Sequence, residues 1–287
     1  MEARDKTVFT AEQLDAYFAS YVGMEGGDPA APVWFCDATP HTWAEALAAP
    51  LVPRAEPTAW DSDFRARHHD VMQRWQSHQK IARIMASARA EVFRRPQSEC
   101  DWQHYFDTHL FAPGGAEFKM SLFPLPANHI GSVPWSQAFR GQPALVPKRR
   151  YLDLCRNGGR FRFVADTRRR WKPKLVVCFG ERHREDFVQA FGLGHVHASE
   201  HVLQPADQAK TLYMVEHDNT TWIMCAALAG AAGMTSDVLL DALGAFIAPW
   251  LEQADFARCG GHCGRAAAVS PQRRLPESSW LGALRAA

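Results

Sequence analysis

Apolar positions recur along the chain with two periods, which predict helices and strands in alternation. From Leu14 to Tyr21 they recur every three or four residues, as one face of an amphipathic helix does. Thr10 and Gln13 have the spacing of a capping box, so the helix is expected to begin there.

Further apolar runs are short and unpatterned, as is typical of buried strands. The predicted strands are 33–36, 118–125 and 175–179, followed by a hairpin of 211–216 and 221–225 around a turn at 217–220. Between them, helices are predicted over 61–90 (one or two), 147–171 and 181–191, with a last helix capped by Thr235 or Ser236.

This alternation predicts a layered α/β fold with a mainly parallel sheet. After about Asp255 the pattern dissolves into Ala, Arg, Ser, Gly and Pro. We therefore expect a single domain over residues 1–254 and a weakly ordered tail over 255–287.

The composition fits an ordinary globular chain of 287 residues, 47% hydrophobic and 22% charged. It excludes disorder, collagen and coiled coil. The charged first residues and the lack of a long apolar segment argue against export and a membrane span. Seven scattered cysteines fit a reduced, cytoplasmic protein better than a disulfide scaffold. The cluster Cys259, His262 and Cys263 resembles only half of a zinc site, so no metal is expected, and no cofactor either.

The net charge of +1 conceals an uneven distribution. The segment from Arg140 to Lys174 carries twelve basic and two acidic side chains, a net charge of +10, which leaves −9 for the rest. Phe161, Phe163 and Trp171 are interleaved with these charges. Such a segment is typical of phosphate-backbone recognition, and it is equally what a solvated helix face looks like.

Ligands of open α/β sheets bind beyond the carboxyl ends of the strands, so the residues there are candidates. The first predicted strand ends at Asp37, and His41 follows; this pair could orient or deprotonate a water. Alternatively Asp37 and Thr39 only cap the next helix. Gly180 ends another strand, where it allows close approach of a ligand or simply makes the turn.

Several common motifs are absent. The chain has no G-x-x-x-x-G-K loop, no G-x-G-x-x-G turn and no G-x-S-x-G elbow. Their absence disfavours a P-loop NTPase, a dinucleotide-dependent enzyme and an α/β-hydrolase.

The segments 28–37 (DPAAPVWFCD), 118–125 (FKMSLFPL) and 172–180 (KPKLVVCFG) follow one another in an order that resembles the uracil-DNA glycosylase superfamily, over roughly residues 20–250. Residues 28–37 are similar to its first strand and water-activating loop, and residues 118–125 to its second core strand. Residues 172–180 are similar to its strand with a Pro-Lys-hydrophobic-Gly pattern. The resemblance implies a three-layer α/β/α sandwich of a bacterial-type DNA-repair protein, a hydrolase that cuts the bond between a base and its sugar after flipping the nucleotide out.

The resemblance also implies roles for particular residues. Asp37 would orient the attacking water, with His41 as a second polar group. The residues that would contact the base are Phe123 or Trp43 by stacking, and Ser121 with Asn128 at the base edge. Those that would bind the phosphates of DNA are Arg149, Arg150, Arg168, Arg169, Arg170 and Gly180.

The sequence departs from the family at several places, and one is the base reader, because Ser121 stands where the family commonly has Asn. Cys36-Asp37 stands where a Gly is expected, residues 226–233 contain no His, and the cysteine spacing differs from that of the iron–sulfur branch. These departures bear on the activity and leave the expected fold unchanged. Two alternatives therefore stand beside a DNA glycosylase: a non-catalytic binding module on the same fold, and a hydrolase of a nucleotide-like small molecule. Neither the oligomeric state nor the base is predicted.

Overall fold

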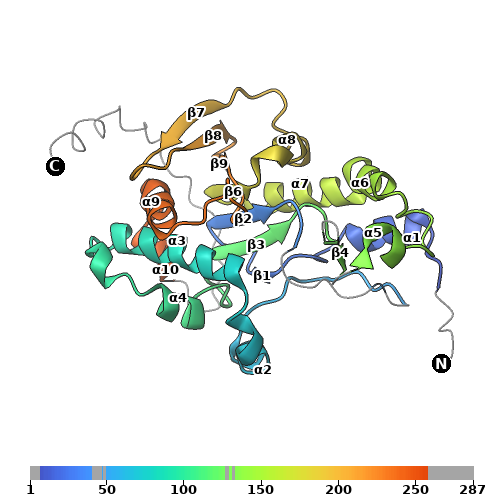
Figure 1. Cartoon of the computed structure of the whole chain (residues 1–287), viewed down its shortest axis with the longest axis horizontal. Coiled ribbons are helices and arrows are strands. Elements are labelled where there is room, and N and C mark those ends of the chain that lie inside the picture. Colours follow the sequence, from blue (N-terminus) through green and yellow to red (C-terminus); the bar gives the residue numbers. More distant parts are fainter. Residues whose placement is uncertain (1–6, 41–46, 48–49, 127–128, 131–132, 258–287) are drawn as a thin grey trace.

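The computed structural model describes residues 7–40, 47, 50–126, 129–130 and 133–257. Within them one seven-stranded sheet forms the centre of the molecule (Figure 1). In spatial order the strands are β1 (Gly26–Gly27), β3 (Glu117–Ser121), β2 (Val33–Asp37), β6 (Leu175–Phe179), β9 (Thr220–Cys225), β8 (Lys210–His217) and β7 (Ser199–Leu203). A separate pair, β4 (His129–Ile130) and β5 (Val133–Pro134), is antiparallel.

The four central strands, β3, β2, β6 and β9, are parallel. Both sides of this core are antiparallel: β1 pairs with β3 on one side, and β8 and β7 extend the sheet from β9 on the other. The α/β class is thus confirmed, and the sheet as a whole is mixed. All four central strands are fully buried, which explains the largely apolar, unpatterned sequences of β2, β6 and β9.

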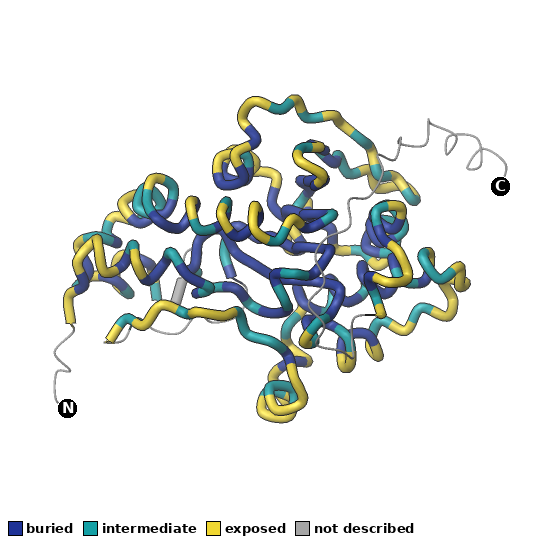
Figure 2. The backbone as a smooth tube through the Cα atoms, turned by 180° about the vertical axis from the view of Figure 1, so that it is seen from behind, coloured by how far each residue is buried: buried dark blue, intermediate teal, exposed yellow. Residues whose placement is uncertain are grey.

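Two apolar clusters cover the two faces of the sheet, because neighbouring side chains of a strand point in opposite directions. Trp34 and Cys36 pack in one cluster, and Val33 and Phe35 in the other. The helices of the first cluster are α1 (Ala11–Phe18), α5 (Trp135–Ala138), α6 (Lys148–Asn157), α7 (Gly159–Trp171) and α8 (Arg184–Phe191). Those of the second are α2 (Ser62–Met72), α3 (Gln76–Val92), α4 (Trp102–Thr108), α9 (Asp237–Ile247) and α10 (Gln253–Phe256). Figure 2 shows the buried strands inside and the exposed outer turns of the helices around them.

Local signals account for several helix ends. The capping box of Thr10 and Gln13 is confirmed at the start of α1. The predicted helix over 147–171 is two helices, divided at Gly158, where a Cβ would overlap the Asp15 carboxylate and the Leu154 carbonyl. The described residues also form three short 3₁₀ segments: η1 (Gln97–Glu99), η2 (Glu181–His183) and η3 (Ala248–Trp250).

The folded part continues past residue 254 into α10, where Asp255 is buried and accepts a hydrogen bond from Lys174 at 2.8 Å. None of the helices in the described part of the chain combines the length and the apolar composition that crossing a bilayer requires.

One buried arginine ties the start of α7 to the sheet. The guanidinium of Arg160 donates to the carbonyls of Phe18, Ser20, Val22, Ser121 and Leu122, three of them at 2.8–2.9 Å. Burial lowers its pKa to about 10, so Arg160 remains charged at neutral pH. It satisfies the carbonyls of two loops and of the end of β3, which would otherwise be buried without donors.

We expect Arg160→Met to destabilise the protein by about 3–5 kcal/mol, because five buried carbonyls lose their charged donor. Arg162→Met is the matched control, since Arg162 is exposed on the same helix and should change the free energy of unfolding by about 0.5 kcal/mol or less. Urea denaturation measures both values. Equal effects of the two substitutions would contradict this role of Arg160.

Candidate functional site

The carboxyl ends of the parallel strands bring several predicted residues to one edge of the sheet, which we call the carboxyl edge. Asp37 ends β2 and is the register partner of Ser121, the last residue of β3. On its other side Asp37 pairs with Phe179, which Gly180 follows. Sequence elements more than 140 residues apart thus meet at this edge.

Asp37 belongs to a buried network of charges on the face covered by α3. Its carboxylate is ion-paired with the Lys119 ammonium, which also lies 3.2 Å from the Glu25 carboxylate. Nε2 of His78 lies 3.7 Å from Glu25 in turn. All four side chains are at most 5% exposed. The site therefore has a low local dielectric, in which charges act strongly on one another and on a ligand.

Lys119 is the cation that makes this network stable. Burial alone would lower the pKa of its ammonium, but the carboxylates of Asp37 and Glu25 together raise it above the ordinary value. Lys119 is therefore charged throughout the neutral range, and its charge favours the ionised form of Asp37.

Ser121 and Gly180 complete the edge beside Asp37. The Ser121 hydroxyl is fully buried and, among the described residues, has no hydrogen-bond partner. A buried polar group without a partner is uncommon and points to a ligand or water. Gly180 has φ +110°, a conformation that favours glycine, and its N–H donates to the Cys225 carbonyl at 2.9 Å. It makes the turn into η2.

Phe123 does not lie where the predicted stacking role requires. Its ring is 1% exposed and packs against Tyr151 and Phe161, with the Arg156 guanidinium 5.6 Å from its centroid. In this structure it is a core residue. His41, Trp43 and Asn128 lie outside the described residues.

The basic segment is divided between opposite edges of the sheet. α7 starts at the carboxyl edge, where Arg160 binds Ser121 and Leu122, and Arg168 lies about 12 Å farther along the helix, in its last turn. Arg168 is buried and donates to Asp218 and to the His217 carbonyl in the β8–β9 turn, at the amino ends of the strands.

The predicted phosphate-binding arginines are thus not brought together. The opposite edge, where the parallel strands begin, is called the amino edge; it holds Arg168, Arg169 and Arg170. Arg169 pairs there with Asp166. Arg149 and Arg150 lie in the first turn of α6, where Arg150 donates to the carbonyls of Pro143 and Val146.

Cations that lie at the carboxyl edge include two that were not among the predicted phosphate-binding residues, Lys148 and Arg182. Arg182 follows Gly180 in η2, and it is exposed. Lys148, the first residue of α6, lies close to Arg182. The pKa of Lys148 is lowered by burial and, to a smaller extent, by the positive charge of Arg182. The sequence feature that could have indicated Arg182 is its position directly after a predicted strand-to-helix turn. No feature indicated Lys148 beyond its place in a basic run.

Lys119 was also missed. A lysine between apolar neighbours in a strand is usually read as pointing to solvent. The polar side chains of Glu117, Lys119 and Ser121 alternate with Phe118 and Met120, and this alternation was the signal that one face of β3 is polar. Among the described residues, no group of three or more His, Cys, Asp or Glu side chains is placed to hold a metal ion.

A second buried carboxylate, Glu117, lies at the amino end of β3. It accepts hydrogen bonds from the Tyr105 hydroxyl at 3.0 Å and from the Phe111 N–H at 3.2 Å. Burial raises the pKa of Glu117 to about 7, although these two hydrogen bonds and the charge of Arg65 act in the opposite direction.

Glu117 should make the protein less stable as the pH rises from about 4.5 to about 7. The folded protein binds the proton more tightly than the unfolded chain, so stability is lost over this interval, by roughly 3 kcal/mol, and is constant above it. Glu117→Gln should remove this part of the pH dependence. Urea denaturation of both proteins at pH 5 and pH 8 measures it, and an identical pH dependence in the two would contradict the assignment.

The comparisons with known proteins leave the function to be argued from this geometry. No protein-family model, no curated protein and no solved structure matches the chain.

Proposed function

We propose that the chain binds nucleic acid at the carboxyl edge and hydrolyses a base–sugar bond there, as its resemblance to the uracil-DNA glycosylase superfamily implies. The observation that carries the proposal is the buried Asp37 carboxylate, ion-paired with Lys119 and adjacent to the Ser121 hydroxyl, which has no hydrogen-bond partner among the described residues. The three-layer α/β/α arrangement belongs to the same proposal, and the two apolar clusters on opposite faces of the sheet support it.

The chemistry follows from the charge of Asp37. Cleavage of a glycosidic bond develops positive charge on the sugar, and a carboxylate held in a low-dielectric site stabilises that charge. Asp37 also accepts a hydrogen bond from the attacking water and orients it. Water adds to the sugar carbon, the base leaves with the bonding electron pair and takes up a proton, and an abasic site remains.

Ser121 supplies the polar contact to the base. Its hydroxyl can both donate and accept a hydrogen bond, and within the described chain neither capacity is used. A hydrogen bond from the base edge would satisfy this buried hydroxyl. The free energy of binding therefore favours a base that can make this hydrogen bond.

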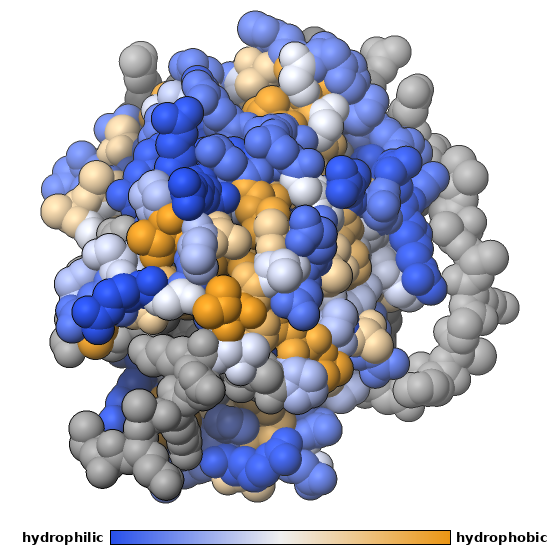
Figure 3. Space-filling view, turned by 90° about the vertical axis from the view of Figure 1, so that its right-hand side faces the viewer, coloured by the Kyte–Doolittle hydropathy of each residue, from blue (hydrophilic) through white to orange (hydrophobic). Residues whose placement is uncertain are grey.

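The carboxyl edge also offers cations for the phosphates. Lys148 and Arg182 lie together there, and Arg149 is next to Lys148. Figure 3 looks at the side of the molecule where α1, α5 and α6 lie, and shows hydrophilic side chains grouped around exposed apolar ones. A single strand of nucleic acid presents both charged phosphates and flat apolar bases, so a mixed face of this kind suits it.

The first test is a base-excision assay on the full chain. The substrates are single- and double-stranded oligonucleotides containing uracil, mismatched thymine, hypoxanthine or an oxidised base, and abasic sites are revealed by alkaline cleavage. We expect product from at least one substrate, and Asp37→Asn to lower the rate at least about 100-fold with DNA affinity retained.

Asp207→Asn is the matched control, because Asp207 is exposed and lies far from Asp37 in the sequence. This variant should keep the full rate. Ser121→Ala, which leaves the ion pair intact, provides a second variant if Asp37→Asn does not fold, and should weaken excision. Absence of an abasic product from every substrate would contradict the catalytic proposal.

The second test asks which edge binds DNA. The double substitution Lys148→Gln/Arg182→Gln should weaken binding and reduce the slope of log affinity against log salt by roughly two, about one for each lost phosphate contact. Arg169→Gln/Arg170→Gln removes the same charge at the amino edge and should leave the slope unchanged. Salt-titrated fluorescence anisotropy measures both, and the reverse result would move the binding surface to the amino edge.

A further inference from the structure

A cavity on the far side of the molecule lies between α3, η1 and α4, away from the carboxyl edge. Its volume is about 290 Å³, and a small niche adjoins it beside Ala116 and Phe256. Arg89, Tyr105 and His109 line both. Ala116 precedes β3, so the cavity opens near the amino ends of the strands, at the opposite end of β3 from Ser121.

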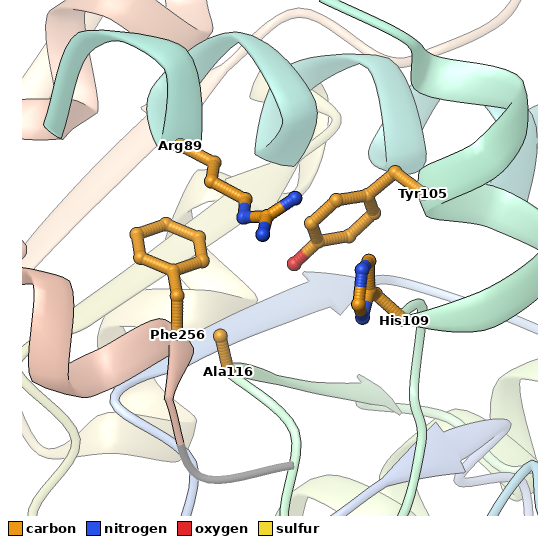
Figure 4. A pocket seen from close by; sticks show the side chains of 5 residues that line it. All are labelled: Arg89, Tyr105, His109, Ala116 and Phe256. Atoms are coloured by element: carbon orange, nitrogen blue, oxygen red, sulfur yellow. The ribbon is translucent and has the colours of Figure 1, made fainter. Parts of the chain in front are cut away.

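Arg89 is the distinctive residue of this cavity. Its side chain is half-buried, and within the described chain its guanidinium makes no hydrogen bond and no ion pair. It lies 5.5 Å from the centroid of the Phe93 ring. Figure 4 shows the guanidinium pointing into the same space as the Tyr105 ring and His109, with Phe256 beyond it. A partly desolvated guanidinium with all its donors available is suited to bind an oxyanion in a bidentate manner.

The surroundings of Arg89 are electropositive. His109 is half-buried, with its ring 5.5 Å from that of His104. Its pKa is lowered by burial and, in addition, by the charges of Arg89, His104 and Arg65. Two carboxylates also line the cavity, Glu99 and Asp101, but both residues are exposed, and Asp101 accepts a hydrogen bond from the His104 N–H at the start of α4.

The remaining walls are apolar. Ala86 and Ala90 are buried on α3, and the rings of Phe93 and Phe256 pack edge to face at 6.2 Å. The cavity thus has a polar side, formed by the Arg89 cation and the His109 imidazole, and an apolar side of small and aromatic residues. Its size approaches the lower end of the range of ligand pockets.

We propose that this cavity binds a small oxyanion, a phosphomonoester or a carboxylate, carried on an aromatic or apolar body. Arg89 pairs with the oxyanion, His109 contributes a second donor, and the body lies against Phe93 and Phe256. This site is independent of the proposed base excision, because it shares no residue with the carboxyl edge.

The experiment uses the full chain and four probes: phenyl phosphate, benzoate, inorganic phosphate and the neutral benzyl alcohol. Thermal unfolding and isothermal calorimetry measure binding. We expect phenyl phosphate or benzoate to bind more tightly than benzyl alcohol, and the stronger of the two identifies the oxyanion. Arg89→Gln should weaken that binding about tenfold or more, because a charge-assisted hydrogen-bonded pair is lost.

Arg67→Gln, an exposed arginine on α2, is the matched control and should bind as the unaltered chain does. His109→Gln provides a second variant, and in the unaltered chain the bound anion should raise the pKa of His109 in an NMR titration. The proposal is overturned if no oxyanion binds more tightly than benzyl alcohol, or if Arg89→Gln binds as well as Arg67→Gln.

Discussion

The burial of the Lys119 ammonium between Asp37 and Glu25 is the constraint on which the centre of the fold depends. An unpaired charge in a protein interior costs several kcal/mol, so Lys119 requires both carboxylates close to it. Because side chains alternate along a strand, a slip of one residue in β3 would move Lys119 to the opposite, apolar face. The ion pairs therefore specify the register that places Asp37 beside Ser121, and the candidate site follows from that register.

Much of the architecture could be predicted from the sequence, because its strongest signals are local. The strand over 175–179 is an uninterrupted apolar run and was predicted with its observed bounds. β3 ends earlier than predicted, at Ser121, although Leu122 and Phe123 still donate to the carbonyls of Asp37 and Ala38. β7 and α4 were not predicted: β7 is a polar edge strand that pairs only with β8, and α4 is a helix of seven residues held by its packing on α3.

The candidate site could be predicted only in part, because its charges are organised in three dimensions. Asp37 and Gly180 were found from their positions at strand ends. Lys119 was not predicted as a site residue, because its partner Asp37 is 82 residues away in the sequence. The basic segment looked like one surface along the sequence, yet α7 carries its two ends to opposite edges of the sheet. Arg168, predicted to bind phosphate, instead holds the β8–β9 turn through Asp218.

Hydrogen–deuterium exchange of the full chain, with and without a single-stranded oligonucleotide at low salt, tests most directly the proposal that nucleic acid binds at the carboxyl edge. If it binds there, residues 148–156 and 180–184 should exchange more slowly, with residues 168–174 and 217–220 unchanged. Slower exchange confined to residues 168–174 and 217–220, or no change anywhere, would contradict it.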